Sequence, residues 1–390
     1  MPALKSCFIL GVLATIVNAA VHELIVGTFV SKALYTLAFD DEDNSLELIA
    51  NISTPVPSSW ISLSHDKKHL YGTDYIYVGA DHNRTIPPVY VGYTIHNSSS
   101  ITLDKSLSGV RPCNGSSIYI IPSPNPPHAV YGADYWGTPG CGCVMSVDAS
   151  GALSEVIQDF EYLNDSGVHG MSFSPGSQVL YSADTLGNYL WTHAIDPTTG
   201  RLGEVLGMAE GPSPKAHPRH VVTHPSGKAI YAVMEGSSEV AWYTVDSTTN
   251  VPTMQEPMYS LLPSGTNGFS YWGDTLALSA SAKYLWATTR AKNDGVPGYI
   301  AVYELNCDGT IVKEKFLKET TTSGGVANAL QPAEFSDRYA ALTDNEIGFV
   351  EIWEMRGDGS DADVIARIDL ADQGNARYAS GCCANAVWLN

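Results

Sequence analysis

The chain has 390 residues and a formal net charge of −20 at pH 7. A surface this acidic repels nucleic acids and anionic membranes, so we expect neither as a partner. Only 16% of the residues are charged, whereas the chain contains 35 glycines and 21 tyrosines, a composition typical of strands and turns. The strand-like runs are short and are separated by Gly, Pro, Ser and Asn, which indicates an all-β fold.

The first 19 residues have the pattern of a secretory signal peptide. Lys5 precedes an apolar core, Cys7–Val17, which is followed by small residues. The stretch is too short to span a membrane, and a buried first strand is the alternative interpretation. We therefore expect residues 1–19 to be removed on export and residues 20–390 to form a single secreted domain, located in the cell wall or at the cell surface.

Two further features suit secretion. Five N-x-S/T sequons are candidate glycosylation sites: Asn51, Asn83, Asn97, Asn114 and Asn164. Without Cys7 the chain keeps an even set of six cysteines, namely Cys113, Cys141, Cys143, Cys307, Cys382 and Cys383. This set is compatible with disulfides in an oxidising compartment, and its spacing leaves the pairing open. The spacing also lacks the usual zinc-ligand pattern, so we expect no metal.

A pair of apolar runs joined by a turn recurs along the chain. Six copies begin at Trp60, Ser116, His169, Arg219, Leu276 and Asn328. A seventh arises if the chain ends are joined, because ANAVWLN at the C-terminus resembles a first strand and HELIVGTF near the start resembles a second. The repeat length of about 46 to 60 residues matches a four-stranded blade. We therefore predict a seven-bladed β-propeller whose last blade is closed by the C-terminal strand pairing with N-terminal strands.

Antiparallel pairing predicts which polar residues meet. The start of the first strand and the end of the second lie at the same rim of the central channel. This rule collects His169, Arg219, Glu235 and Arg290, with Lys292 and Asn328 close by. Arg219 and Glu235 could alternatively form a purely structural ion pair, and His169 could be a hydrogen-bonded turn residue. Asp184 and Asp344 occupy comparable positions, where turn capping is the more natural role.

Two arginines, a histidine and a glutamate suit the binding of a polycarboxylate and the transfer of a proton. The sequence contains no Walker loop, dinucleotide glycine motif, nucleophile elbow or H-E-x-x-H. We therefore predict acid/base chemistry without a cofactor, or simple binding. The predicted catalytic residues are His169, Arg219, Glu235 and Arg290, and the predicted substrate-binding residues are Arg219, Arg290, Lys292 and Asn328.

Several longer segments carry a family resemblance: GVHGMSFSP, LYSADTLGNYLWTH, HPRHVVTHPSGKAIYAVMEG, KYLWATTRAKN and TDNEIGFVEIW. From about His22 to the C-terminus the chain resembles the fungal 3-carboxy-cis,cis-muconate cyclase family, within the lactonase-like propellers that also include 6-phosphogluconolactonases. The resemblance implies an isomerase that closes 3-carboxy-cis,cis-muconate or a similar polycarboxylate into a lactone by adding a carboxylate across a C=C bond. It also implies a site of His169, Arg219, Glu235 and Arg290.

Two positions depart from the family pattern. Val326 follows SGG where the family typically has histidine, and Trp272 stands in YWGD where the family tends to have arginine. Secreted members similar to this chain are cell-surface glycoprotein antigens. The resemblance therefore also implies an alternative, an adhesive module that binds extracellular matrix or cell-wall components through the same fold with a vestigial site. Hydrolysis of a lactone on this scaffold is a third alternative.

Overall fold

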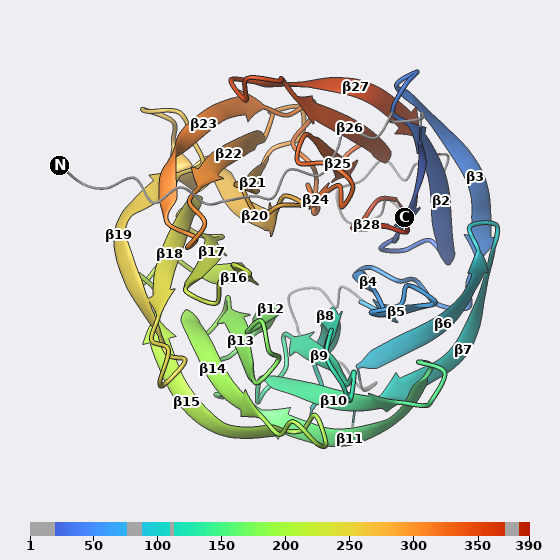
Figure 1. The fold of residues 1–390 in the computed structure, drawn as a ribbon, viewed down its shortest axis with the longest axis vertical. Coiled ribbons are helices and arrows are strands. Elements are labelled where there is room, and N and C mark those ends of the chain that lie inside the picture. Colours follow the sequence, from blue (N-terminus) through green and yellow to red (C-terminus); the bar gives the residue numbers. More distant parts are fainter. Residues whose placement is uncertain (1–19, 76–87, 110–112, 371–381) are drawn as a thin grey trace.

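Seven antiparallel four-stranded sheets surround a central channel in the computed structural model (Figure 1). The structure describes residues 20–75, 88–109, 113–370 and 382–390. The predicted signal peptide at residues 1–19 and the sequon at Asn83 lie outside the described residues. The predicted seven-bladed propeller is confirmed.

The blades follow one another in chain order, and we number them from 1 to 7. Blade 1 holds β1 (Val21–Val26), β2 (Ala33–Asp40), β3 (Ser45–Ser53) and the C-terminal β28 (Ala386–Trp388). Blade 2 holds β4 (Ile61–Leu63), β5 (His69–Thr73), β6 (Val89–Asn97) and β7 (Ser100–Ser108). Blade 3 holds β8 (Ser116–Pro122), β9 (Val130–Tyr135), β10 (Cys141–Val147) and β11 (Leu153–Glu161). Blade 4 holds β12 (Val168–Phe173), β13 (Val179–Asp184), β14 (Tyr189–Ile195) and β15 (Leu202–Glu210).

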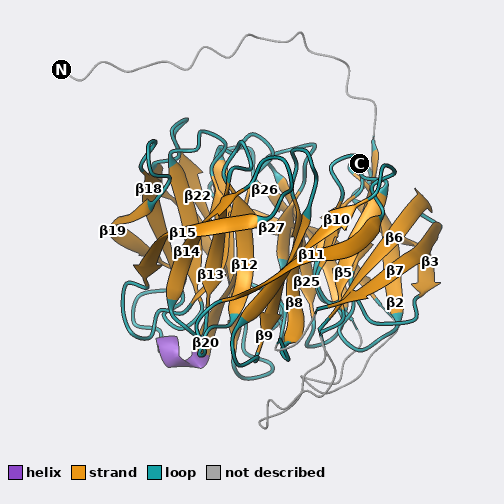
Figure 2. Ribbon diagram, turned by 90° about the horizontal axis from the view of Figure 1, so that it is seen from below, coloured by secondary structure: helices purple, strands orange, loops and turns teal. Residues whose placement is uncertain are grey.

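The remaining three blades repeat the arrangement. Blade 5 holds β16 (Pro218–Thr223), β17 (Ala229–Met234), β18 (Glu239–Val245) and β19 (Pro252–Ser260). Blade 6 holds β20 (Tyr271–Leu278), β21 (Tyr284–Ala291), β22 (Tyr299–Leu305) and β23 (Ile311–Glu319), preceded by the short 3₁₀ turn η1 (Gly268–Ser270). Blade 7 holds β24 (Leu330–Pro332), β25 (Tyr339–Asp344), β26 (Phe349–Met355) and β27 (Ala362–Asp369). Seen from the side, the connecting loops gather on two opposite faces of the ring (Figure 2).

The ring is closed by the two ends of the chain. Strand β28 pairs antiparallel with β1, with Trp388 opposite Leu24 and Ala386 opposite Val26. This is the closure predicted from the sequence, and it leaves β28 as the inner strand of blade 1. Among the described residues, no helix is long and apolar enough to cross a membrane.

The second strand of a blade is buried on both faces, because neighbouring blades pack against each side. All six residues of β9, β13 and β17 are buried, whereas the outermost strands β3 and β15 are largely accessible. A continuous apolar run such as AIYAVM in β17 is therefore a consequence of the ring and needs no alternation of polar and apolar residues.

Tyrosines of these second strands connect consecutive blades. Their hydroxyls donate to a loop carbonyl of the next blade: Tyr71 to Gly151 (2.6 Å), Tyr131 to Gly200 (2.5 Å), Tyr181 to Asn250 (3.1 Å) and Tyr231 to Gly309. Each acceptor residue has a positive φ between 59° and 100°, which glycine and asparagine adopt most readily. The repeat seen in the sequence is thus also a repeated inter-blade hydrogen bond.

The structure pairs some of the disulfide candidates and leaves one of them free. Cys113 is bonded to Cys141, and Cys382 to its neighbour Cys383. Cys143, which the sequence analysis counted among disulfide candidates, is a buried free thiol. Its burial raises the pKa of the thiol well above its usual range, so it packs as a small apolar residue.

Candidate functional site

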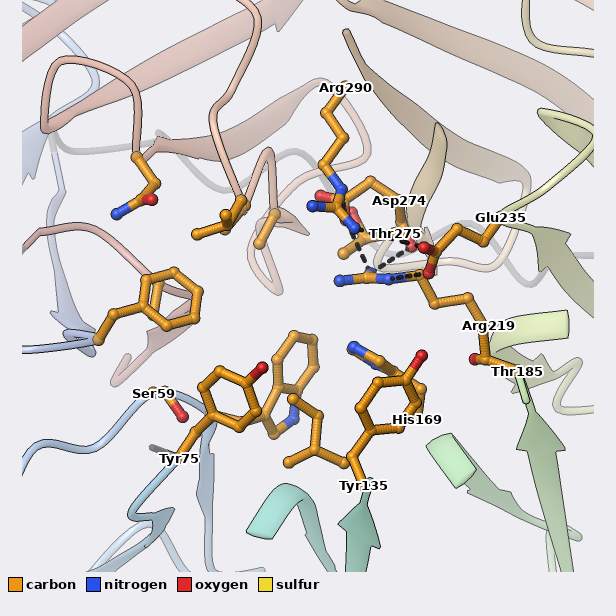
Figure 3. A pocket seen from close by; sticks show the side chains of 18 of the residues that line it. Ser59, Tyr75, Tyr135, His169, Thr185, Arg219, Glu235, Asp274, Thr275 and Arg290 are labelled. Atoms are coloured by element: carbon orange, nitrogen blue, oxygen red, sulfur yellow. Dashed lines mark hydrogen bonds and ion pairs between the residues drawn. The ribbon is translucent and has the colours of Figure 1, made fainter. Parts of the chain in front are cut away.

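A cavity of about 900 Å³ lies where the inner strands converge, and residues from all seven blades line it. This volume is typical of sites for small molecules. All four predicted catalytic residues, His169, Arg219, Glu235 and Arg290, line this one cavity. Figure 3 shows them grouped on one side of it.

β-bulges in the inner strands aim several of these side chains into the cavity. In β12 the pairing with β13 skips His169, and in β16 the pairing with β17 skips Arg219. Strand β8 skips Ile118 in the same way, and β20 has an irregularity that spans Asp274. A residue skipped by the ladder changes direction relative to its neighbours. Four successive blades therefore present Ile118, His169, Arg219 and Asp274 to the same space.

The two arginines share two carboxylates. Arg219 Nε lies 3.1 Å from Glu235 Oε2, and Arg219 Nη1 lies 2.8 Å from Asp274 Oδ1. Arg290 approaches the same two acids at longer distances, 3.6 Å from Nη2 to Glu235 Oε1 and 3.4 Å from Nε to Asp274 Oδ1. Figure 3 shows these contacts between neighbouring blades. The four charges balance, as buried charges must.

Asp274 was missed by the sequence analysis, although it organises the site. It is fully buried, it also accepts a hydrogen bond from the Asn328 backbone N–H at 2.7 Å, and its own carbonyl accepts one from Arg219 at 2.7 Å. Burial lowers the pKa of Arg219, and the charge of Asp274 counteracts that effect. The signal that could have identified Asp274 is its position in the inner strand of blade 6, comparable to that of Arg219 in blade 5.

His169 is held by a second histidine. Its Nδ1 lies 3.3 Å from His220 Nε2, which leaves the His169 Nε2 for other partners. Burial lowers the pKa values of both imidazoles well below the usual range for histidine. The positive charge of Arg219 lowers them further. His169 is therefore neutral at pH 7. His220 in turn packs against Trp60 and Tyr119.

Tyr135 is a further cavity residue that the sequence analysis did not single out. It ends β9, packs edge-on against His169, and faces the cavity below the arginines in Figure 3. Burial, followed by the charge of Glu235, raises the pKa of Tyr135 well above its usual range. The phenol therefore stays protonated and can donate a hydrogen bond to a ligand.

Lys292 and Asn328, predicted to bind substrate, are not among the residues that line the cavity. The Asn328 side chain donates to the Thr289 carbonyl at 2.8 Å. Lys292 Nζ lies 4.8 Å from the centre of the Trp272 ring, and it is Trp272 that lines the cavity. The substrate-binding role of these two residues stays a prediction, and the structure gives Asn328 a supporting position beside Asp274.

Asp184 and Asp344 act as turn caps, the role that the sequence favoured. Asp184 accepts from the backbone N–H groups of Gly167 and Gly187, and Asp344 from those of Ile347 and Gly348. Within the described part of the chain, no group of three or more His, Cys, Asp or Glu residues is placed to hold a metal ion.

Fold and site together define a seven-bladed propeller with a charged small-molecule cavity at the convergence of its inner strands. Residues 23–326 match the family model described as lactonase, 7-bladed beta-propeller. The chain belongs to this family.

Among similar proteins, the carboxy-cis,cis-muconate cyclase of Neurospora crassa is 32% identical over 95% of this chain and 99% of its own length. The muconate cycloisomerase 1 of Cutaneotrichosporon cutaneum is 27% identical over 86% of this chain and 91% of its own. A solved structure of a putative 6-phosphogluconolactonase from Bacteroides fragilis superposes with a TM-score of 0.75 at 15% identity, covering 95% of this chain and 98% of that one. The last likeness shows the fold alone.

Proposed function

We propose that this protein closes an unsaturated polycarboxylate of the muconate class into a lactone without a cofactor. The observation that carries the proposal is the buried pair Arg219 and Arg290. Their charge is balanced by Glu235 and Asp274, which lie on the same side of the cavity. The similarity to two enzymes, a carboxy-cis,cis-muconate cyclase and a muconate cycloisomerase, supports the same substrate class.

In the proposed reaction, one substrate carboxylate is held by Arg219 and Arg290 while another adds to the C=C bond. A C–O bond forms, and the π electrons move toward the held carboxylate, where the two guanidinium groups stabilise the enolate-like charge. The adjacent carbon then takes a proton delivered through Glu235 or His169, and water restores that proton. Because His169 is neutral at pH 7, it can take part in proton transfer without adding charge to the site.

The proposal is tested by proton balance as well as by absorbance. Closure of a muconate dianion to a lactone monoanion removes the diene absorbance and takes up one proton per turnover. Hydrolysis of a lactone by water releases a proton instead. Incubation with cis,cis-muconate and substituted muconates in a pH-stat is expected to show uptake. Release of protons from lactones without uptake from muconates would favour the hydrolase alternative, and neither signal at high enzyme concentration would refute catalysis.

We also propose that the protein is exported and N-glycosylated. Asn51, Asn97 and Asn164 are exposed, and Asn114 is half-buried, so three of these four sequons are accessible to a glycan. Secretion into the medium, followed by a mass decrease on treatment with peptide N-glycosidase, is the expected result. A protein that is retained in the cytosol with the full-length mass would contradict the proposal.

A further inference from the structure

The charges that line the cavity cancel. Among the described lining residues there are three cations and three carboxylates, namely Lys32, Arg219, Arg290, Asp74, Glu235 and Asp274. His169 adds no charge, because its pKa is lowered well below the usual range by burial and by Arg219. A ligand with several carboxylates would thus enter a cavity without net positive charge, in a protein whose net charge is −20.

The arginine pair can accept one further carboxylate. The ion-pair distances and the hydrogen bond of the two arginines involve Nε and Nη1 of Arg219 and Nε and Nη2 of Arg290. Arg290 is 9% exposed, and its ion pairs are as long as 3.4 and 3.6 Å. A terminal nitrogen of each arginine points into the cavity in Figure 3. Two such groups match the two oxygens of a single carboxylate that bridges them.

Much of the remaining wall is apolar. Phe29, Trp60, Tyr75, Ile118, Trp136 and Leu186 line the cavity away from the ion pairs. Figure 3 shows Tyr75 across the cavity from Arg219 and Arg290. Trp272 also lines it, with its ring over the Arg290 guanidinium at 4.7 Å. Lys292 lies against the same ring and is not itself among the residues that line the cavity.

We infer that the substrate is a cis,cis-muconate that carries an aromatic or alkyl group in place of a third carboxylate. This inference rests on the proposed cyclisation. One carboxylate bridges Arg219 and Arg290, the second is the nucleophile, and the apolar substituent packs among the aromatic side chains around Tyr75. A third carboxylate against this wall would lose much of its hydration. The one further cation among the described lining residues, Lys32, is exposed, and the carboxylates of the cavity offset its charge, so this placement is unfavourable. An aryl group there would instead bury apolar surface and stack on aromatic rings.

The test compares 3-phenyl-cis,cis-muconate with 3-carboxy-cis,cis-muconate on the purified full chain. We expect kcat/KM, followed by diene absorbance, to be higher for the phenyl compound by roughly tenfold or more. Equal values, or a preference for the tricarboxylate, would overturn the inference while leaving cyclisation intact. If neither compound is cyclised, the proposed function fails, and the substrate assignment that rests on it fails with it.

A charge placed on the apolar wall gives a second test. Val326 lines the cavity and is half-buried. Val326→Lys adds a cation to this part of the wall, so we expect kcat/KM for the tricarboxylate, relative to that for the phenyl compound, to rise about tenfold. Val326→Met is the matched control, because it adds length without charge and should leave this ratio unchanged. Thermal melts of both variants exclude misfolding, and identical ratios in the two folded variants would count against the inference.

Discussion

The two arginines on the charged side of the cavity differ in how closely they are paired with protein groups. Arg219 is anchored by a hydrogen bond to the Asp274 carbonyl and by close contacts with both acids, whereas Arg290 is paired only at longer distances. The two arginines are therefore not equivalent. Arg219 is a fixed part of the scaffold, and Arg290 retains more of its hydrogen-bonding capacity for a ligand.

Replacement of Arg290 should separate binding from folding. In Arg290→Ala we expect KM for a muconate substrate to rise about 10- to 100-fold, because one charge-assisted contact with the carboxylate is lost. Arg290→Lys should recover part of this loss, since lysine keeps the charge but not the planar fork. Arg367→Ala removes an arginine that pairs with Asp369 on blade 7, outside the lining of the cavity, and should leave KM unaltered. An unchanged KM in Arg290→Ala would contradict the proposed clamp.

Buried histidines should make the protein less stable in acid. Burial lowers the pKa of His193 to about 4, whereas a histidine in an unfolded chain titrates near 6.5. Between these values the unfolded state binds a proton that the native state does not. The free energy of unfolding should therefore fall with decreasing pH by roughly 1.4 kcal/mol per pH unit for such a group.

The measurement is the urea midpoint at pH 7, 6 and 5 for the native sequence and for His193→Gln. The variant should show a shallower decline over this range, because it no longer contributes a proton to the difference. His96→Gln, at an exposed position, should decline as the native sequence does. If the urea midpoints of all three proteins declined in parallel with pH, the lowered pKa of His193 would be contradicted.

At the level of elements, the second strands of blades 2 to 5 are connected to the next blade through tyrosine hydroxyls. Tyr71, Tyr131, Tyr181 and Tyr231 each donate to a loop carbonyl of the following blade. Gly200 illustrates how closely these loops approach, because a Cβ built at its φ of +74° would lie 2.5 Å from Ala129 Cβ. Glycine is thus required there both for its conformation and for its lack of a side chain.

Removal of one such hydroxyl should measure how much a single inter-blade hydrogen bond contributes to stability. We expect Tyr181→Phe to lower the free energy of unfolding by about 1 kcal/mol, since the Asn250 carbonyl loses its donor. Tyr243→Phe is the matched control, because its buried hydroxyl has no hydrogen-bond partner among the described residues. That change should be neutral or slightly stabilising. Equal losses in the two variants in urea titrations would show that the inter-blade bond contributes nothing specific.

For the whole molecule, the critical contact is the one that closes the ring. Strand β28 has only three residues, and Trp388 is its main buried side chain. The indole donates to the Gln331 carbonyl at 3.1 Å and packs edge-on against Phe39 and Phe335. Asn385 extends the closure to blade 2, because its side chain exchanges two hydrogen bonds of 2.9 Å with the backbone of Ile61.

Opening this closure should destabilise the entire propeller. We expect Trp388→Ala to cost about 3–5 kcal/mol, the range for loss of a large buried aromatic side chain. Val364→Ala, at an accessible position on β27, should stay within about 0.5 kcal/mol of the native sequence. Equilibrium unfolding by circular dichroism gives both values. A loss in Trp388→Ala no larger than in the control would mean that the ring does not depend on this strand.

The ring itself could be predicted from the sequence because its signals are local. Paired apolar runs at regular intervals, with a tyrosine or tryptophan in the second run, specify hairpins wherever they occur. The half-repeats at the two ends specify the closure of the ring. Antiparallel pairing then determines that Arg219, Glu235 and Arg290 share one rim. These inferences need only the strand period and the direction of neighbouring strands.

Asp274, Tyr135 and the true position of Lys292 depended on the tertiary structure. Asp274 enters the cavity through an irregularity in β20, and Lys292 lies against the Trp272 ring without itself lining the cavity. Whether a strand bulges, and which face a side chain then takes, is decided by the packing of one blade against the next. The pairing of cysteines also depended on the folded structure, since Cys113 just before β8 meets Cys141 at the start of β10 within blade 3, whereas Cys143 is buried and unpaired. The sequence by itself thus determined the repeat and the closed ring, whereas contacts between blades decided which side chains meet in the cavity.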